Sequence, residues 1–164
     1  MDCYRITKYN PLFRNEKGYY AANSWTSVSD IGKTFGDGIL TVEKYKQTED
    51  SYVEAVKIIL KEKGISKMTV CGLEKNDDMS EVVFSSKEKS FFEGVTNNFC
   101  AELSEIESAV RLALRETIWC SLLSEKGDVK IEFGYDYYMY VSCDAVEEST
   151  KQIILNNGLF IETT

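Results

Sequence analysis

Residues 129–141 read VKIEFGYDYYMYV, and this stretch decides the expected fold. Residues 129–133 alternate between apolar and polar side chains, and residues 135–141 continue with the aromatic side chains that strands favour. Gly134 interrupts the two runs, as expected for a turn. The sequence therefore predicts two strands that pair as a hairpin, and a sheet to which the hairpin belongs.

Downstream of the hairpin the sequence predicts one short helix and a final strand. Asp144 is placed to cap a helix over about residues 145–156, with Glu147 at the reciprocal position of a capping box. Gly158 follows this helix, where a glycine commonly ends one. Residues 159–162 then predict a terminal strand.

Two longer helices are expected upstream, because apolar residues there recur at helical spacing. The first spans about residues 42–63, with Thr41 as its N-cap and Gly64 just past its end. The second begins at the capping box Ser104–Glu107 and continues to Gly127, with Ile118 and Leu122 on its apolar face.

The remaining strands are shorter. Residues 3–9 alternate as a strand does, and the strand ends at Asn10-Pro11 because proline has no N–H for a ladder. Residues 12–40 are rich in Gly, Asn, Ser and aromatics and predict an ordered loop, with one short helix capped by Ser27 or Ser29. Further strands are expected at residues 67–73 and 81–84, with a turn at 76–78 between them.

Together these elements predict a single α+β domain over residues 1–164, since no repeat, low-complexity tract or linker divides the chain. The expected order is β, α, β, β, α, β, β, α, β. A short mixed or antiparallel sheet would carry two long helices and one shorter C-terminal helix. A chain of this size buries about two-thirds of the surface that its unfolded form exposes, so we expect it to fold without a cofactor.

The chain contains no histidine. This absence removes the commonest general base and metal ligand, and it excludes Ser-His and Cys-His nucleophilic machinery. Gly32–Gly38 lacks the spacing of a phosphate loop, and no acidic stretch has the pattern of a calcium loop. We therefore expect no enzyme activity, no metal and no cofactor. A small enzyme or ligand-binding domain that uses carboxylates and tyrosines in a pocket stays the alternative.

The formal net charge is −8, and it is concentrated in the C-terminal part: residues 1–98 carry −1 and residues 99–164 carry −7. Such a surface repels nucleic acid and attracts a basic partner, although the same charge also serves solubility alone.

The N-terminus has no apolar run behind a basic start, and no segment is apolar enough for a membrane helix. We expect a cytoplasmic protein without membrane contact, whose five cysteines are buried, reduced thiols.

Six residues form the predicted partner-binding site. In the second strand of the hairpin, Asp136, Tyr138 and Tyr140 share one face, and tyrosine is favoured at interfaces. Asp144, Glu147 and Glu148 follow directly. They either cap a helix or extend the tyrosine face into an acidic patch for the Arg and Lys side chains of a partner. A strand buried on both faces is the alternative for the tyrosines.

Four segments resemble small bacterial immunity proteins of polymorphic or contact-dependent toxin systems: Tyr4–Pro11, Trp25–Gly32, Arg115–Cys120 and Phe133–Tyr140. The resemblance implies a protein that binds and neutralises a cognate toxin, often a nuclease. It assigns no toxin-binding residue. The leading hypothesis is an immunity protein whose acidic, tyrosine-rich surface binds a basic toxin domain. A regulatory interaction module is a further alternative.

Overall fold

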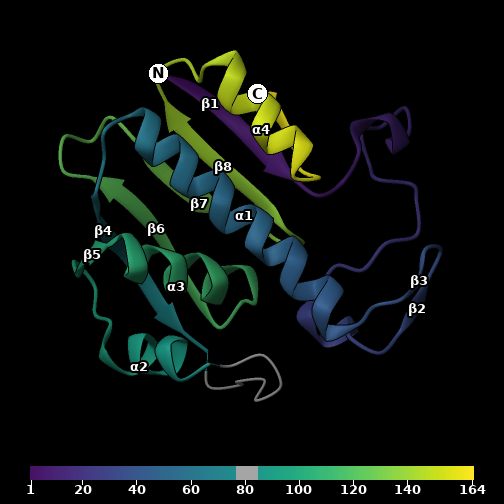
Figure 1. The fold of residues 1–164 in the computed structure, drawn as a ribbon, viewed down its shortest axis with the longest axis horizontal. Helices are drawn as coiled ribbons and strands as arrows, with labels where there is room; N and C mark the ends of the chain where they lie inside the picture. Colours follow the sequence, from purple (N-terminus) through teal and green to yellow (C-terminus); the bar gives the residue numbers. More distant parts are fainter. Residues whose placement is uncertain (77–84) are drawn as a thin grey trace.

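The centre of the structure is a seven-stranded sheet, with the strand order β5-β4-β6-β7-β8-β1-β9 (Figure 1). This computed structural model describes residues 1–76 and 85–164. All six pairings between neighbouring strands are antiparallel. The strands are β1 (Asp2–Thr7), β4 (Lys67–Lys75), β5 (Cys100–Glu102), β6 (Ile118–Ser124), β7 (Lys130–Phe133), β8 (Tyr138–Cys143) and β9 (Phe160–Thr163).

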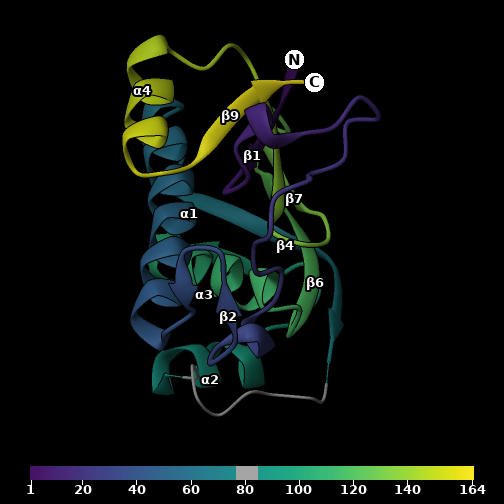
Figure 2. The same cartoon turned by 90° about the vertical axis from the view of Figure 1, so that its right-hand side faces the viewer.

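The helices cover one face of this sheet, and the long helix α1 crosses its middle (Figures 1 and 2). In the described ranges there are four α-helices: α1 (Val42–Glu62), α2 (Ser86–Gly94), α3 (Leu103–Leu114) and α4 (Glu148–Asn156). Between β1 and α1 lie two 3-10 helices, η1 (Pro11–Phe13) and η2 (Val28–Asp30), and a two-stranded sheet of β2 (Thr34–Phe35) and β3 (Gly38–Ile39).

Alternation along the strands divides the core from the other face of the sheet. In β8, Met139, Val141 and Cys143 are fully buried, whereas Tyr138 and Tyr140, at the alternate positions, are only half-buried. Successive side chains of a strand point to opposite faces, so the two tyrosines lie on the face away from the helices. We call this the open face.

The segment that follows β1 packs on the open face near β1, β8 and β9. Arg14, which follows η1, forms an ion pair with Glu162 of β9 at 2.8 Å. The ring of Tyr9 lies 5.5 Å from that of Tyr138 and 4.8 Å from that of Tyr20, measured between centroids. The loop predicted for residues 12–40 is therefore an ordered part of the fold. Its short helix η2 is capped by Ser27, as expected.

The prediction of an α+β chain with a β7–β8 hairpin is confirmed, but two details of the predicted architecture are wrong. The sheet is not short, because seven strands join it. Instead of three helices the described residues hold four, since α2 lies in a region for which no element was predicted. Ser85 and Glu88 form a capping box at its start. The strand predicted at 81–84, and most of the turn at 76–78, lie outside the described residues.

The second long helix was also predicted too long. It ends at Leu114, and Ile118 and Leu122 belong to strand β6 instead. Both residues are completely buried, and a spacing of four places two residues on one side of a helix and of a strand alike. Glu116 ends the helix by adopting a left-handed φ of 58°, with hydrogen bonds from Glu116 N–H to Ala113 O and from Thr117 N–H to Leu112 O.

Two predicted caps lie elsewhere. The carboxylate of Glu105 accepts a hydrogen bond from the backbone N–H of Glu102, so the start of α3 is two residues before the predicted box. Helix α4 begins at Glu148 with Glu147 as its N-cap residue, so Asp144 does not cap it. The terminal strand and the glycine after α4 are confirmed by β9 and by the left-handed Gly158.

Candidate functional site

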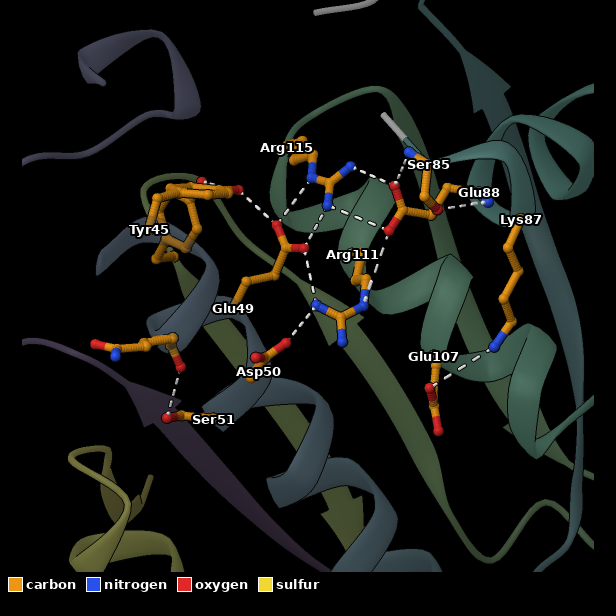
Figure 3. Close-up of polar contacts among 12 residues, drawn as sticks. Tyr45, Glu49, Asp50, Ser51, Ser85, Lys87, Glu88, Glu107, Arg111 and Arg115 are labelled. Atoms are coloured by element: carbon orange, nitrogen blue, oxygen red, sulfur yellow. Dashed lines mark hydrogen bonds and ion pairs between the residues drawn. The ribbon is translucent and has the colours of Figure 1, made fainter. Parts of the chain in front are cut away.

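Among residues 1–76 and 85–164, the buried charged side chains gather where three helices meet (Figure 3). Glu49 of α1 and Glu88 of α2 both accept hydrogen bonds from Arg115, the C-cap residue of α3, with Nε to Glu49 Oε2 and Nη1 to Glu88 Oε2 each at 2.8 Å. Arg111 Nη1, one turn earlier, lies 3.1 Å from Glu49 Oε1 and 2.8 Å from the carboxylate of Asp50. The side chains of Glu49 and Arg115 are 0% and 3% exposed. The network thus fixes the packing of α1, α2 and α3.

The network is internally satisfied. Burial would raise the pKa of Glu88, but the hydrogen bonds from Arg115 and from the Ser85 N–H outweigh it and lower this pKa. Across residues 1–76 and 85–164, no buried side-chain nitrogen or oxygen lacks a hydrogen-bond partner. The network therefore has a complete structural role. It was not predicted, although Arg111 and Arg115 lie four residues apart on one helix, which is a signal for a shared partner.

A hydrogen-bonded chain leads from this network to an aromatic cluster under the hairpin. Tyr45 donates to Glu49 Oε2 at 2.7 Å, and Tyr137 donates to the Tyr45 hydroxyl at 2.9 Å. The ring of Trp25 packs on both tyrosines, at centroid distances of 5.4 and 4.9 Å. Burial raises the phenol pKa of Tyr45, and the nearby Glu49 carboxylate raises it further, so this hydroxyl stays protonated.

Tyr137 belongs to the turn of the hairpin, and the turn is strained. Asp136 and Tyr137 have positive φ angles of 57° and 66°. Tyr138 N–H donates to Tyr135 O at 3.3 Å. Asp136 and Tyr137 are therefore the central pair of a tight turn. Hairpin turns with two positive φ angles normally contain Asn or Asp followed by Gly, so Asp136 suits its position and Tyr137 pays the steric cost. The burial of Tyr137, which is 3% exposed, holds the turn in place, while Tyr135, the first residue of the turn, is 75% exposed.

Lys8 lies beside this cluster in an unusual setting. Its Nζ atom is 4.1 Å from the centroid of the Tyr9 ring and 4.0 Å from that of Trp25, and it donates to Ser24 Oγ at 2.7 Å. Burial lowers the pKa of the Lys8 ammonium to about 7, against the opposing effect of Asp37, Asp30 and Asp136.

The surface around Lys8 combines tyrosines with carboxylates. Asp37 and Asp136 lie close enough to raise the pKa of the Lys8 ammonium against burial, and burial raises the pKa of the Tyr20 phenol, which the nearby Tyr138 and Asp37 raise further. Tyr135 is next to Asp136 in the turn and points to solvent. We call this group the hairpin-tip surface. It consists of Tyr20, Asp37, Tyr135, Asp136 and Tyr138.

The structure separates the six residues predicted to bind a partner. Asp136 and Tyr138 belong to the hairpin-tip surface. Tyr140 lies farther along the open face, paired in register with Arg5 of β1 and Glu132 of β7.

Asp144, Glu147 and Glu148 follow the other end of β8, which is about 17 Å from Tyr138 at the usual rise of a strand. There the backbone N–H of Glu147 lies 3.3 Å from the Glu62 carboxylate, and Glu148 pairs with Lys151 at 2.7 Å. The predicted residues therefore lie at two separate places on the molecule.

Two hollows flank the start of α3, on the helical side. One, of about 450 Å³, is lined by Phe91, Val95 and Phe99. The other, of about 420 Å³, is lined by Ile58, Ile65 and Leu103. Since the buried polar side-chain atoms described here all have partners, neither hollow presents an unpaired buried group to a ligand.

The described part of the chain has neither a metal-binding cluster nor a membrane helix. No group of three or more Cys, Asp or Glu residues is placed to hold a metal ion. No helix there is long and apolar enough to cross a membrane.

The cysteines carry no disulfide, but the prediction that they are buried is wrong for most of them. Only Cys143 is fully buried, and Cys100 is exposed because it lies in the edge strand β5.

Comparison of the chain with protein-family models, curated proteins and solved structures finds no match.

Proposed function

We propose that this chain is a cytoplasmic immunity-type protein that inhibits a basic toxin domain by binding it through the hairpin-tip surface. The observation that carries the proposal is the strained turn, which leaves Tyr135 75% exposed beside Asp136. The left-handed conformation costs about 1–2 kcal/mol for a residue such as Tyr137, whereas aspartate, as at position 136, adopts it more readily. Strain of this kind concentrates at binding and catalytic sites, where the surrounding structure holds it.

The turn is built as a rigid support for its tip. Tyr137 is anchored between Trp25 and Tyr45, and the hydroxyl of Tyr52 donates to Tyr137 O at 2.7 Å. A side chain presented from a fixed backbone loses little conformational freedom on binding, which favours affinity. Tyrosine is also enriched among the residues that dominate binding energies. Tyr135 is therefore the expected centre of the interface.

The charges support a basic partner. Of the five basic residues in the acidic C-terminal part, Arg111 and Arg115 are engaged by Glu49, Glu88 and Asp50 inside the helical layer. Fewer cations then remain to offset the C-terminal carboxylates at the surface. Asp37 and Asp136 are both exposed and would steer a basic surface toward the hairpin tip.

The test is protection of cells from a toxin domain encoded beside this gene, followed by binding kinetics with the purified pair. We expect the wild-type chain to protect and to bind, and Tyr135→Ala to raise the dissociation rate at least tenfold, through lost contact. The double variant Asp37→Asn/Asp136→Asn should slow association and weaken its salt dependence.

Glu147→Gln/Glu148→Gln is the matched control, because it also removes two charges but lies beyond the far end of β8. It should leave both rates within about twofold. If this control slows association as much as the Asp37/Asp136 variant, the hairpin tip is not the binding surface. If the wild-type chain neither protects nor binds, the immunity proposal is wrong, and a pocket-based activity takes precedence.

A further inference from the structure

Strand β9 forms one edge of the seven-stranded sheet and lies beside α4 (Figure 2). Thr164 N–H donates to Cys3 O at 2.9 Å, and in an antiparallel pair such bonds recur at every second residue. In the register of β9 on β1, the N–H and C=O groups of Ile161 and Thr163 therefore point away from β1. Within residues 1–76 and 85–164 these four groups have no hydrogen-bond partner. They form a short free ladder.

This edge lacks the usual protection against pairing with another strand. Edge strands are commonly protected by a lysine, a proline, a β-bulge or a charge that points inward. The sequence of β9 is FIET, and its pairing with β1 is regular. Its one charged residue, Glu162, is held by Arg14 at 2.8 Å and by Arg5 at 3.0 Å. The backbone of β9 is therefore available to a further strand.

A groove of about 250 Å³ lies along the same edge. Phe160 and Ile161 of β9 line it, together with Leu155 of α4 and Pro11 of η1. We call this hollow the β9 groove. Since α4 covers the helical side of the sheet and η1 the open face, the groove has a wall on each side of the edge. Both walls offer apolar surface, because Leu155 is 46% exposed and Leu12, next to Pro11, is 86% exposed.

The charged side chains that line the β9 groove are already paired. Lys151 lies 2.7 Å from the carboxylate of Glu148, and Glu162 is paired with the two arginines named above. No lining charge among the described residues is left to select a charged ligand. The groove therefore favours an uncharged, apolar one.

We propose that the β9 groove binds an extended, uncharged apolar segment of a partner protein, which joins the sheet as a further strand next to β9. The backbone of this segment pairs with Ile161 and Thr163, and its alternate side chains contact Leu155 and Pro11 on the two walls. This binding goes beyond the proposed toxin inhibition, because the β9 groove shares no residue with the hairpin-tip surface.

A second copy of the chain fits the β9 groove less well than such a segment. The β9 strand of a second copy carries its own α4 and η1 walls, which would have to enter the space that the first pair of walls occupies. Each chain also has a net charge of −8, and this charge opposes self-association.

A phage-displayed library of random heptapeptides, selected on the wild-type chain, is the probe. We expect the enriched peptides to have apolar side chains at alternate positions and no charged residue. Their binding is then measured by fluorescence anisotropy with purified variants. Leu155→Glu brings a charge to the apolar wall and should weaken binding at least tenfold.

Ile153→Glu is the matched control, because Ile153 belongs to the same helix, is 42% exposed and does not line the groove. It should leave the affinity within about twofold of the wild-type value. Circular dichroism checks that both variants are folded.

Methylated peptides test the backbone pairing on the wild-type chain, so this test does not depend on how the variants fold. Alternate N–H groups of an extended strand point to opposite sides, and only one set can pair with β9. Methylating the nitrogens of that set should weaken binding at least tenfold, and methylating the other set should not.

Four outcomes overturn the proposal. They are the absence of enriched peptides, enrichment of charged peptides, equal effects of the two glutamate variants, and equal effects of the two methylation patterns. Sedimentation velocity examines the competing occupant: a dimer that Leu155→Glu dissociates would assign the β9 groove to a second copy and would likewise overturn the proposal.

Discussion

Removing Arg115 should be one of the most destabilising single substitutions in the helical layer. Arg115→Met keeps the aliphatic stem but leaves the completely buried Glu49 with only Arg111 and Tyr45 as partners. It also removes the arginine that lies 2.8 Å from Glu88. Breaking a buried ion pair by deleting one partner costs about 3–5 kcal/mol. For a chain of this length that corresponds to a Tm about 6–20 °C lower.

Urea and thermal unfolding, followed by circular dichroism, measure this loss. Arg14→Met is the matched control: it also removes an arginine from a carboxylate, but Glu162 keeps Arg5 at 3.0 Å and is partly exposed. The control should cost no more than about 1 kcal/mol. Adding Glu49→Gln to Arg115→Met should recover part of the loss, since the uncompensated charge is then removed. Equal losses in Arg115→Met and Arg14→Met, or a further loss in the double variant, would refute the argument.

Three further outcomes are expected. Burial would raise the pKa of Glu88 in the folded protein, but Arg115 and the Ser85 N–H lower it on balance. The ionised Glu88 carboxylate therefore stabilises the folded state fully above about pH 4.5, and this contribution is lost as the pH falls further. Urea titrations at several pH values should accordingly show that the difference in the free energy of unfolding between wild type and Arg115→Met becomes smaller in acid. In the turn, Asp136→Gly should change the free energy of unfolding by no more than about 0.5 kcal/mol, because aspartate tolerates a positive φ. Tyr137→Gly should instead destabilise the protein by about 3 kcal/mol or more, because the buried ring is lost; equal effects in chemical denaturation would contradict the anchor role. With a thiol reagent at pH 7.5, the exposed Cys100 should react first and Cys120 slowly, since burial raises the pKa of Cys120 to about 12; Cys100→Ser should abolish the fast phase.

Helix ends show which local signals were sufficient. Gly64 and Gly158 were expected to follow helices, and each has a left-handed φ just after α1 and α4. Glu116 ends α3 with the same conformation but is not a glycine, so the residue type at this position did not predict the end of the helix. The helix was consequently extended through Ile118 and Leu122, whose spacing fits either period.

The candidate site was partly predictable. The unusual run of aromatics drew attention to Asp136 and Tyr138, which do lie at the hairpin-tip surface. Tyr135 was assigned to a strand and not to the tip, because the turn falls one residue after Gly134 and uses Asp136 and Tyr137 at positive φ. Propensity argues against that conformation for tyrosine, so only the packing of Tyr137 in the core explains it.

By itself the sequence determined the α+β class, the β7–β8 hairpin, the first and last strands and helix α1, because apolar periodicity and glycine positions act over a few neighbouring residues. The tertiary structure alone decided the seven-strand order, the Glu49–Arg115–Glu88 network and the setting of Lys8. Lys8 contacts Ser24 and Trp25, and Arg115 contacts Glu49 from 66 residues away. Contacts of this kind depend on how whole elements pack, and their energies come from burial that no local pattern encodes.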